Sequence, residues 1–526
     1  MGPNVSRVAL SIRISSLVLP MATLLAIWSE PALCRSTPPA DSAQPAAPAI
    51  VERVVSELIV IEVYAVDSKG RPVTNLRKED LVLQVDGLVH PVHSFELRHH
   101  AQREDIHPPR AAGDAALHPR RFVLFFDDAF SRQETMTVAR RDAARFLQGD
   151  MTSQDQISLI SYGRGPQILR DFTTDRGDLL AALEQSLHDP KRRSEYAIEM
   201  REHAEQILEL LPGRRPPGGD SVVSREVVNL VRTFATEDVA RMSRMLGTLR
   251  TLSDALSAWP GYKAIIYLGD GIPENPALDY IEPFAGSDTG SDLAAVVEKY
   301  NLSAEIRSLS LAASAHGVTL HTVQASGLLA GSGSELRASS RRSNSLETLA
   351  MNSGGSASKS NDLVSALHEV ESRSLSYYAL GFVPDGEPDG APHSIRLRAR
   401  RSDVRLGWRR EFVRLRPREA HQRAILAAHL LPGFQPPLDL SAAPGPTAGS
   451  QRAVDLVVYL PADQLLFLPD GQGLSAQIEI GFVALGNDQR ETARLARTLR
   501  IRRPASTARP LFDGLNIVAH IALPAD

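Results

Sequence analysis

The sequence predicts an α/β protein with a doubly wound, mostly parallel sheet that is flanked by small β-rich modules. Four short runs rich in apolar and β-branched residues have the length of buried strands, and the first and third of them are apolar throughout. These runs are Phe122 to Phe126, Gln156 to Tyr162, Ala264 to Leu268 and Val318 to Val323. Helix-like stretches alternate with them, and such alternation indicates βαβ units and a parallel sheet.

The first 34 residues predict an export signal. Arg7 and Arg13 give it a positive start, an apolar run from Leu17 to Trp28 follows, and Ala32-Leu33-Cys34 resembles a cleavage site. The apolar run is shorter than the roughly 20 residues that a spanning helix needs. We therefore expect a secreted, periplasmic or cell-envelope protein with no transmembrane span in the mature chain. An uncleaved anchor or a misassigned start codon is the alternative.

Composition excludes several classes of protein. The chain has 526 residues, of which 43% are hydrophobic and 23% charged, as in ordinary globular proteins and unlike a wholly disordered chain. The net charge of −4 leaves no basic excess for a nucleic-acid partner. Cys34 is the single cysteine, so cleavage after it would leave no thiol for catalysis, zinc binding or a disulfide.

The regions around the predicted sheet divide by composition. Residues 35–50 are rich in Pro and Ala and read as a disordered linker. Residues 51–100 read as an N-terminal β-rich module, because apolar runs flank an Asp86-Gly87 hairpin turn. We expect the α/β domain over 119–375, a β-hairpin extension over 376–415, a linker over 420–450 and a β-sandwich-like module over 453–526.

The predicted α/β domain has two unusual segments. The second and third strands are separated by far more chain than one crossover needs, and we interpret residues 190–258 as a helical insertion. Its apolar residues Val227, Leu230, Val231 and Phe234 have helical spacing, which predicts packing against the sheet, with a partner-binding face as the alternative. Residues 326–344 are rich in Gly and Ser and predict a mobile loop.

Carboxylates follow two of the predicted parallel strands. Asp127 and Asp128 come directly after one apolar run, and Asp270 follows another. Ligands of open α/β sheets bind beyond the carboxyl ends of the strands, and oxygen ligands suit Mg²⁺. The competing interpretation is that these aspartates cap helices or turn the chain.

The same residues resemble the von Willebrand factor type A domain. That family's first motif is Asp-x-Ser-x-Ser, and the matching stretch here is Asp127-Asp128-Ala129-Phe130-Ser131. Its later Thr-Asp-Gly motif corresponds to Gly269-Asp270-Gly271. The resemblance implies a metal site formed by Asp127, Ser131 and Asp270. Ala129 replaces a ligand serine, and the ligand threonine has no clear counterpart, with Thr236 and Thr248 as candidates.

An exported bacterial subfamily of von Willebrand A-related proteins has a similar order of motifs. The stretches that carry this resemblance are Val66 to Gly87, Asp127-Asp128, Pro260 to Lys263, His316 to Thr319 and Ser376 to Phe382. It implies a protein-binding, adhesion or scaffold function toward a partner protein in the envelope or extracellular space. Because two ligand oxygens are missing, we expect weak or absent Mg²⁺ binding and no other cofactor.

Other motifs carry less information about function. His99, His100 and His107 lie in a polar segment and predict solvated histidines, while Asp385 to Gly390 predicts a hairpin turn. We find no phosphate loop, zinc-protease motif or nucleophile elbow, so no catalytic residue is assigned and we expect a protein without enzymatic activity. The alternative is a metal-dependent hydrolase that uses Asp127, Asp128 and Asp270 around a metal-activated water.

Overall fold

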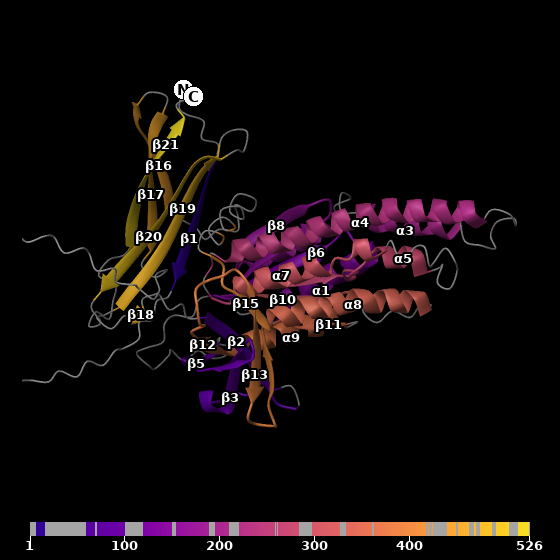
Figure 1. Ribbon diagram of the computed structural model, residues 1–526, viewed down its shortest axis with the longest axis horizontal. Coiled ribbons are helices and arrows are strands. Elements are labelled where there is room, and N and C mark those ends of the chain that lie inside the picture. The colour runs from indigo at the N-terminus through magenta and orange to yellow at the C-terminus, as the bar shows by residue number, and fades with distance from the viewer. Residues whose placement is uncertain are drawn as a thin grey trace, which may run out of the picture.

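The computed structural model describes residues 7–15, 59–68, 71–99, 119–149, 154–188, 195–209, 220–257, 259, 261–282, 297–326, 333–359, 362–416, 419, 423, 439–448, 451–461, 468–469, 474–485, 491–503 and 514–524. These ranges hold a six-stranded sheet with helices on its faces, a β-sandwich beside it, and two further sheets formed largely by the C-terminal strands (Figure 1).

Six strands form the central sheet in the order β11-β10-β9-β6-β7-β8. In chain order they are β6 (Arg121–Asp127), β7 (Gln156–Tyr162), β8 (Pro166–Thr173), β9 (Lys263–Gly269), β10 (Val318–Gln324) and β11 (Ala357–Ser358). Neighbours are parallel except for β7 and β8. The predicted parallel sheet is confirmed. Strand β8 was not predicted, because this half-exposed edge strand lacks a continuous apolar run.

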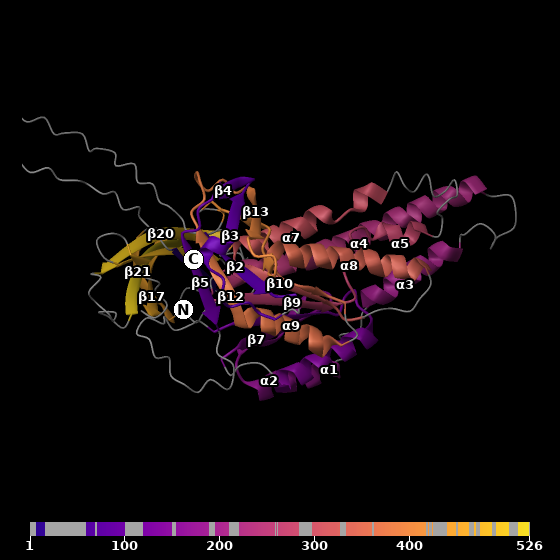
Figure 2. The same ribbon diagram turned by 90° about the horizontal axis from the view of Figure 1, so that it is seen from below.

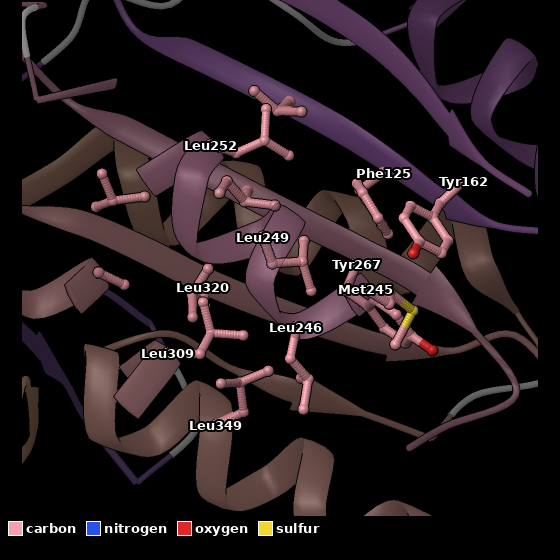
Figure 3. Packing of buried hydrophobic residues seen from close by; sticks show 14 of the residues in the cluster. Phe125, Tyr162, Met245, Leu246, Leu249, Leu252, Tyr267, Leu309, Leu320 and Leu349 are labelled. Atoms are coloured by element: carbon pink, nitrogen blue, oxygen red, sulfur yellow. The ribbon is translucent and has the colours of Figure 1, made fainter. Parts of the chain in front are cut away.

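Helices cover both faces of the central sheet. Helices α1 (Gln133–Gly149), α2 (Arg176–Leu187) and α9 (Leu363–Leu375) share one apolar cluster with Phe122, Leu124 and Phe126 of β6. Helices α4 (Asp220–Leu256), α7 (Ser303–Ala315) and α8 (Gly333–Ser353) share the other with Val123 and Phe125. Figure 3 shows leucines of these three helices around Leu320 of β10. Burial on both faces explains why β6 and β9 are apolar without alternation.

The predicted helical insertion consists of α3 (Glu195–Glu209) and the long helix α4. The C-terminal half of α4 packs on the sheet, whereas its N-terminal half packs with α3 and α5 (Ala277–Ile281). These three pieces project together from the end of the sheet in both views, and we call them the arm (Figures 1 and 2). The prediction that Val227 and Phe234 pack on the sheet is wrong, because they lie in the separate core of the arm.

Helix α8 begins inside the segment that was predicted as a mobile loop, residues 326–344. That prediction is wrong for residues 333–344. Arg341 and Arg342 form ion pairs with Asp279, and Ser343 is buried beside Gln324 of β10. These long-range contacts override a Gly/Ser-rich composition that is otherwise typical of loops.

A β-sandwich, which we call the sandwich, combines the segments 51–100 and 376–415 that the sequence analysis separated. One sheet has the order β14-β2-β12-β5 and the other β15-β13-β3-β4, and Ile61, Leu83, Phe382 and Phe412 belong to the core between them. The strands are β2 (Ile59–Val66), β3 (Leu81–Val85), β4 (Leu88–His90), β5 (Ser94–His99), β12 (Ser376–Phe382), β13 (Pro392–Ala399), β14 (Arg405–Trp408) and β15 (Glu411–Val413). Asp86 and Gly87 have φ of 49° and 85°, as the predicted hairpin turn requires.

The sandwich and the α/β domain are joined directly. Helix α9 ends at Leu375 and β12 begins at Ser376, so no connecting residue separates them. Tyr64 of β2 and Tyr377 of β12 belong to an apolar cluster of the α/β domain. The buried Arg120 donates to both oxygens of Asp155 and to the Ser374 hydroxyl in the last turn of α9.

The C-terminal strands form two further sheets. One contains β16 (Asp439–Ala448), β17 (Gln451–Pro461) and β21 (Gly514–Pro524), and the other contains β1 (Arg7–Ser15), β18 (Leu468–Pro469), β19 (Leu474–Leu485) and β20 (Glu491–Arg503). The linker prediction for 420–450 is wrong over β16, where Pro444 lies at a register shift, a position that tolerates proline. Strand β1 pairs with β19, and its removal with an export signal stays a prediction.

The structure also bears on the predictions about a membrane span, the histidines and residues 385–390. No helix within the described ranges combines the length and the apolar character that crossing a membrane requires. Residues 35–50, His100 and His107 lie outside the described residues, while His99 ends β5. Residues 385–390 lie in the connection between β12 and β13, but these two strands belong to opposite sheets of the sandwich and do not pair, so the prediction of a hairpin over 376–415 with its turn at 385–390 is wrong.

Gly355 is required by a close approach between backbone segments. A Cβ at this position would lie 1.9 Å from the carbonyl oxygen of Leu320. We expect Gly355→Ala to lower the free energy of unfolding by about 1–3 kcal/mol or more, because the backbone of β10 has to move. Gly247→Ala is the matched control, since its Cβ meets nothing within 4 Å and a helical alanine should stabilise by about 0.5–1 kcal/mol. Urea unfolding followed by circular dichroism measures both, and equal effects would contradict the expectation.

Asp238 in the arm should make stability depend on pH. Burial raises the pKa of its carboxyl to about 6, with smaller contributions from Glu237 and Asp279. A raised pKa contributes stability that is fully present below the unfolded-state value of 3.8 and is lost as the pH rises through 6. This loss amounts to about 3 kcal/mol. Asp238→Asn should remove it, whereas the exposed Glu237→Gln should not, as urea titrations at pH 4.5 and 7.5 would show.

Candidate functional site

The candidate site lies where the order of the central sheet reverses. Strands β6 and β9 are parallel neighbours, and the chain order of the strands runs outward from them in both directions. Asp127 is the last residue of β6, and Asp270 directly follows the last residue of β9. The structure therefore brings the predicted aspartates to the switch point, where open α/β sheets bind their ligands.

Asp127 is fully buried, and both of its carboxylate oxygens accept hydrogen bonds from the protein. The Tyr267 hydroxyl donates to Oδ2 at 2.5 Å, and the backbone N–H of Phe130 donates to Oδ1 at 3.1 Å. The pKa of Asp127 is raised to about 7, chiefly by burial and to a smaller extent by Asp128 and Asp270, while the two donors act in the opposite direction. The carboxyl group is thus held inside the protein rather than presented to a ligand.

Tyr267 reaches Asp127 because a glycine follows it on the same face of β9. A Cβ on Gly269 would lie 2.6 Å from the Tyr267 hydroxyl and 3.0 Å from Oγ of Ser131. Any other residue would therefore displace the tyrosine. Sequence reasoning missed Tyr267, although a tyrosine two residues before a glycine on a buried strand was the available signal.

Asp128 forms an ion pair on the other side of β6. Arg140 of α1 donates to its Oδ2 at 2.5 Å, and the Ser161 hydroxyl donates to the same oxygen. Both charged side chains are almost completely buried, and the guanidinium lies over the ring of Phe126 at 4.9 Å. Asp128 therefore neutralises a buried arginine and does not extend the predicted metal site.

Ser131 and Asp270 are joined by a hydrogen bond, and Arg132 binds the Asp270 carboxylate. The backbone N–H of Asp270 donates to Oγ of Ser131 at 2.9 Å. The Asp270 carboxylate accepts from Arg132 through its backbone N–H at 2.9 Å and its Nε at 3.2 Å, both on Oδ2. Its Oδ1 is buried without a hydrogen-bond partner among the described residues. The guanidinium of Arg132 thus supplies the positive charge beside Asp270.

The oxygens at this site do not fit the octahedral requirement of Mg²⁺. Both oxygens of Asp127 are bonded internally, Ala129 has no ligand atom, and Asp270 retains one unpaired oxygen beside a guanidinium. Thr236 and Thr248 each donate to a carbonyl one turn earlier in α4. Within the described residues, no group of three or more His, Cys, Asp or Glu side chains could hold a metal ion.

The arm and α8 cover the loops that follow β6 and β9. The ring of Tyr196 in α3 lies 6.0 Å from that of Phe130, and Arg241 of α4 lies over Tyr196 at 4.4 Å. Gly271 has a φ of +109°, and a Cβ there would lie 2.7 Å from Cβ of Arg342 in α8. The insertion, whose placement the sequence does not predict, therefore lies over the switch point.

Comparisons with known proteins give only distant likenesses. No protein-family model matches the chain, and no curated protein matches it. Solved structures similar to it include an aerotolerance-related membrane protein from Bacteroides fragilis (11% identity, TM-score 0.25) and BatB from Bacteroides thetaiotaomicron (10%, 0.23), each matched over 48% of this chain and 98% of its own. A von Willebrand factor type A protein from Catenulispora acidiphila is matched over 63% and 75% (10%, 0.25). Such TM-scores support no conclusion about function.

The Asp128–Arg140 pair should be strongly coupled. Arg140→Met leaves a buried carboxylate without its counter-charge, which typically costs about 3–5 kcal/mol. The double variant Arg140→Met/Asp128→Asn should recover most of this loss, because no uncompensated charge remains. Chemical unfolding of the parent, both single variants and the double variant measures the coupling. Additive losses would show that the two side chains act independently.

Proposed function

We propose that the chain is an exported binding or scaffold protein of the cell envelope that contacts a partner protein without a bridging metal ion. The resemblance to von Willebrand A-type proteins in the sequence motifs motivates the binding function. One observation supports binding without a metal ion: donors from the protein itself already bind the carboxylates at the switch point. There the Tyr267 hydroxyl and the Arg132 guanidinium engage Asp127 and Asp270.

The same geometry supports a function without catalysis. A general base must reach the proton that it removes, and a metal-activated water needs an open coordination position. Asp127 and Asp128 are buried with 0% and 3% exposure and are bonded to their own protein neighbours. No observation in the described residues favours the alternative of a metal-dependent hydrolase.

The arm is the part of the molecule that a partner approaching the switch point would meet first. Tyr196 of the arm lies over the loop after β6 and Arg342 of the adjoining helix α8 lies over the loop after β9, so a partner side chain would have to displace them to reach the carboxylates. We therefore propose that partner contacts involve the arm rather than the aspartates. Secretion or envelope location rests on the predicted export signal alone.

Partner binding should survive removal of divalent cations. A pull-down with the tagged mature chain from envelope extract should retain the same specific proteins in EDTA and in MgCl₂. Asp127→Asn should retain them as well, because the amide oxygen can still accept from the Phe130 N–H while the amide NH2 donates to the Tyr267 hydroxyl oxygen. Loss of the same partner in EDTA and in Asp127→Asn would revive a metal-bridged mechanism.

Thermal unfolding gives an independent measurement that needs no partner. We expect millimolar MgCl₂ or MnCl₂ to shift the Tm of the parent protein no more than the same salt shifts the Tm of Asp127→Asn. A cation that binds the folded state must raise its stability by mass action. A rise in Tm at micromolar cation in the parent, absent in Asp127→Asn, would contradict the proposal.

A further inference from the structure

A second polar cluster lies at the opposite end of the sheet, where the α/β domain meets the sandwich. Glu62 of β2 carries a half-buried carboxylate into this contact. Its Oε2 accepts from the Tyr64 hydroxyl at 3.0 Å and from the Thr319 hydroxyl of β10 at 3.5 Å. Burial raises the pKa of this carboxyl, and Tyr64, Arg409 and Lys263 offset part of that effect.

Arg409 enters the same contact from the turn between β14 and β15. Its guanidinium donates to the carbonyl oxygen of Ser314 in the last turn of α7 and to that of Val60 in β2 at 2.7 Å. A cation at the C-terminal end of a helix is favourable because free carbonyls point toward it. Gly354 accommodates the turn, since a Cβ there would lie 3.0 Å from the backbone N of Arg409.

Glu62 and Arg409 face one cavity without touching each other. Its volume is about 30 Å³, and both side chains line it together with Ser314, Thr319 and Ser353. The buried Nε of Arg409 has no hydrogen-bond partner among the described residues. One water needs about 10–15 Å³ and two or more polar partners. The cavity therefore has room for two water molecules and the polar groups to hold them.

The charges around the cavity favour water over an ion. The carboxylate of Glu62 repels an anion, whereas Arg409 and the nearby Lys263 repel a cation. Lys263 donates to the carbonyl of Trp259 at 2.9 Å, and burial lowers its pKa to about 8. A neutral molecule that donates to Glu62 and accepts from Nε satisfies both sides. Bridging waters are nearly as favourable as direct hydrogen bonds.

We propose that two bound water molecules in this cavity link the Glu62 carboxylate to Nε of Arg409, and that this hydrated ion pair fixes the sandwich against the α/β domain. The link connects β2, β10 and the β14–β15 turn, which come from distant parts of the chain. It makes the two modules one mechanical unit at the end opposite the arm.

A crystal structure of the parent protein tests the occupant directly. Two density peaks with water-like contacts to Glu62 and Arg409 are expected. Soaks in bromide and in rubidium should give no anomalous peak in the cavity. An anomalous peak for either ion, or a cavity without ordered density, would overturn the assignment of water.

Hydrogen–deuterium exchange tests the mechanical role in solution. Glu62→Gln and Arg409→Gln should each speed amide exchange in residues 59–66 and 318–324 by roughly threefold to tenfold, as expected for one lost hydrogen-bonded link. The double variant should exchange no faster than the faster single variant, because both remove the same link. Exchange in α3 and the N-terminal half of α4 should stay unchanged.

The control is another ion pair between the same two modules. Arg307 of α7 and Glu411 of β15 are 2.8 Å apart, but the arginine is 59% exposed. Arg307→Gln should therefore leave exchange in 59–66 nearly unchanged. Strictly additive effects of Glu62→Gln and Arg409→Gln, or effects no larger than this control, would contradict the proposed link.

Discussion

The pairing of β6 with β9 is the contact on which the rest of the molecule depends. Both strands are buried on both faces, so their polar residues are confined to the two ends. Asp127 and Asp270 lie at the carboxyl ends, while Arg121 and Lys263 are paired in register at the amino ends. The sheet thus separates an acidic end, covered by the arm, from a basic end, covered by the sandwich. Each end needs neighbours that satisfy its charges.

Apolar periodicity was sufficient to predict the centre of the fold. The runs at β6 and β9 indicate strands because their interiors are apolar throughout, and those at β7 and β10 because they are short and rich in aliphatic and β-branched residues. The intervening helical segments indicate a parallel sheet. The N-terminal part of helix α8 could not be predicted in the same way. Its Arg341 and Arg342 form ion pairs with Asp279, which lies 62 and 63 residues earlier in the chain, and local composition carries no trace of such contacts.

The candidate site was predictable in position but not in chemistry. Two aspartates after neighbouring strands fix where the switch point lies, because parallel strands end at the same edge. Whether those aspartates are free depends on Tyr267, Arg132 and Arg140, and each donor finds its acceptor only through the folded chain. The Tyr267–Asp127 bond joins residues 140 positions apart. Motif comparison detects the missing serine at Ala129 but not the donors that replace a metal.

The direct passage from α9 into β12 has a consequence for the order of synthesis. Strands β2 to β5 leave the ribosome early, yet their partners β12 and β13 follow only after the whole α/β domain. The Leu76 N–H, for example, donates to the hydroxyl of Tyr378, 302 residues later. The β3–β4 hairpin can form at once, but β2, β5 and the other edge of β3 must wait for β12 and β13 while the inserted domain folds. Nascent chains stalled before residue 376 should expose apolar strand edges to chaperones.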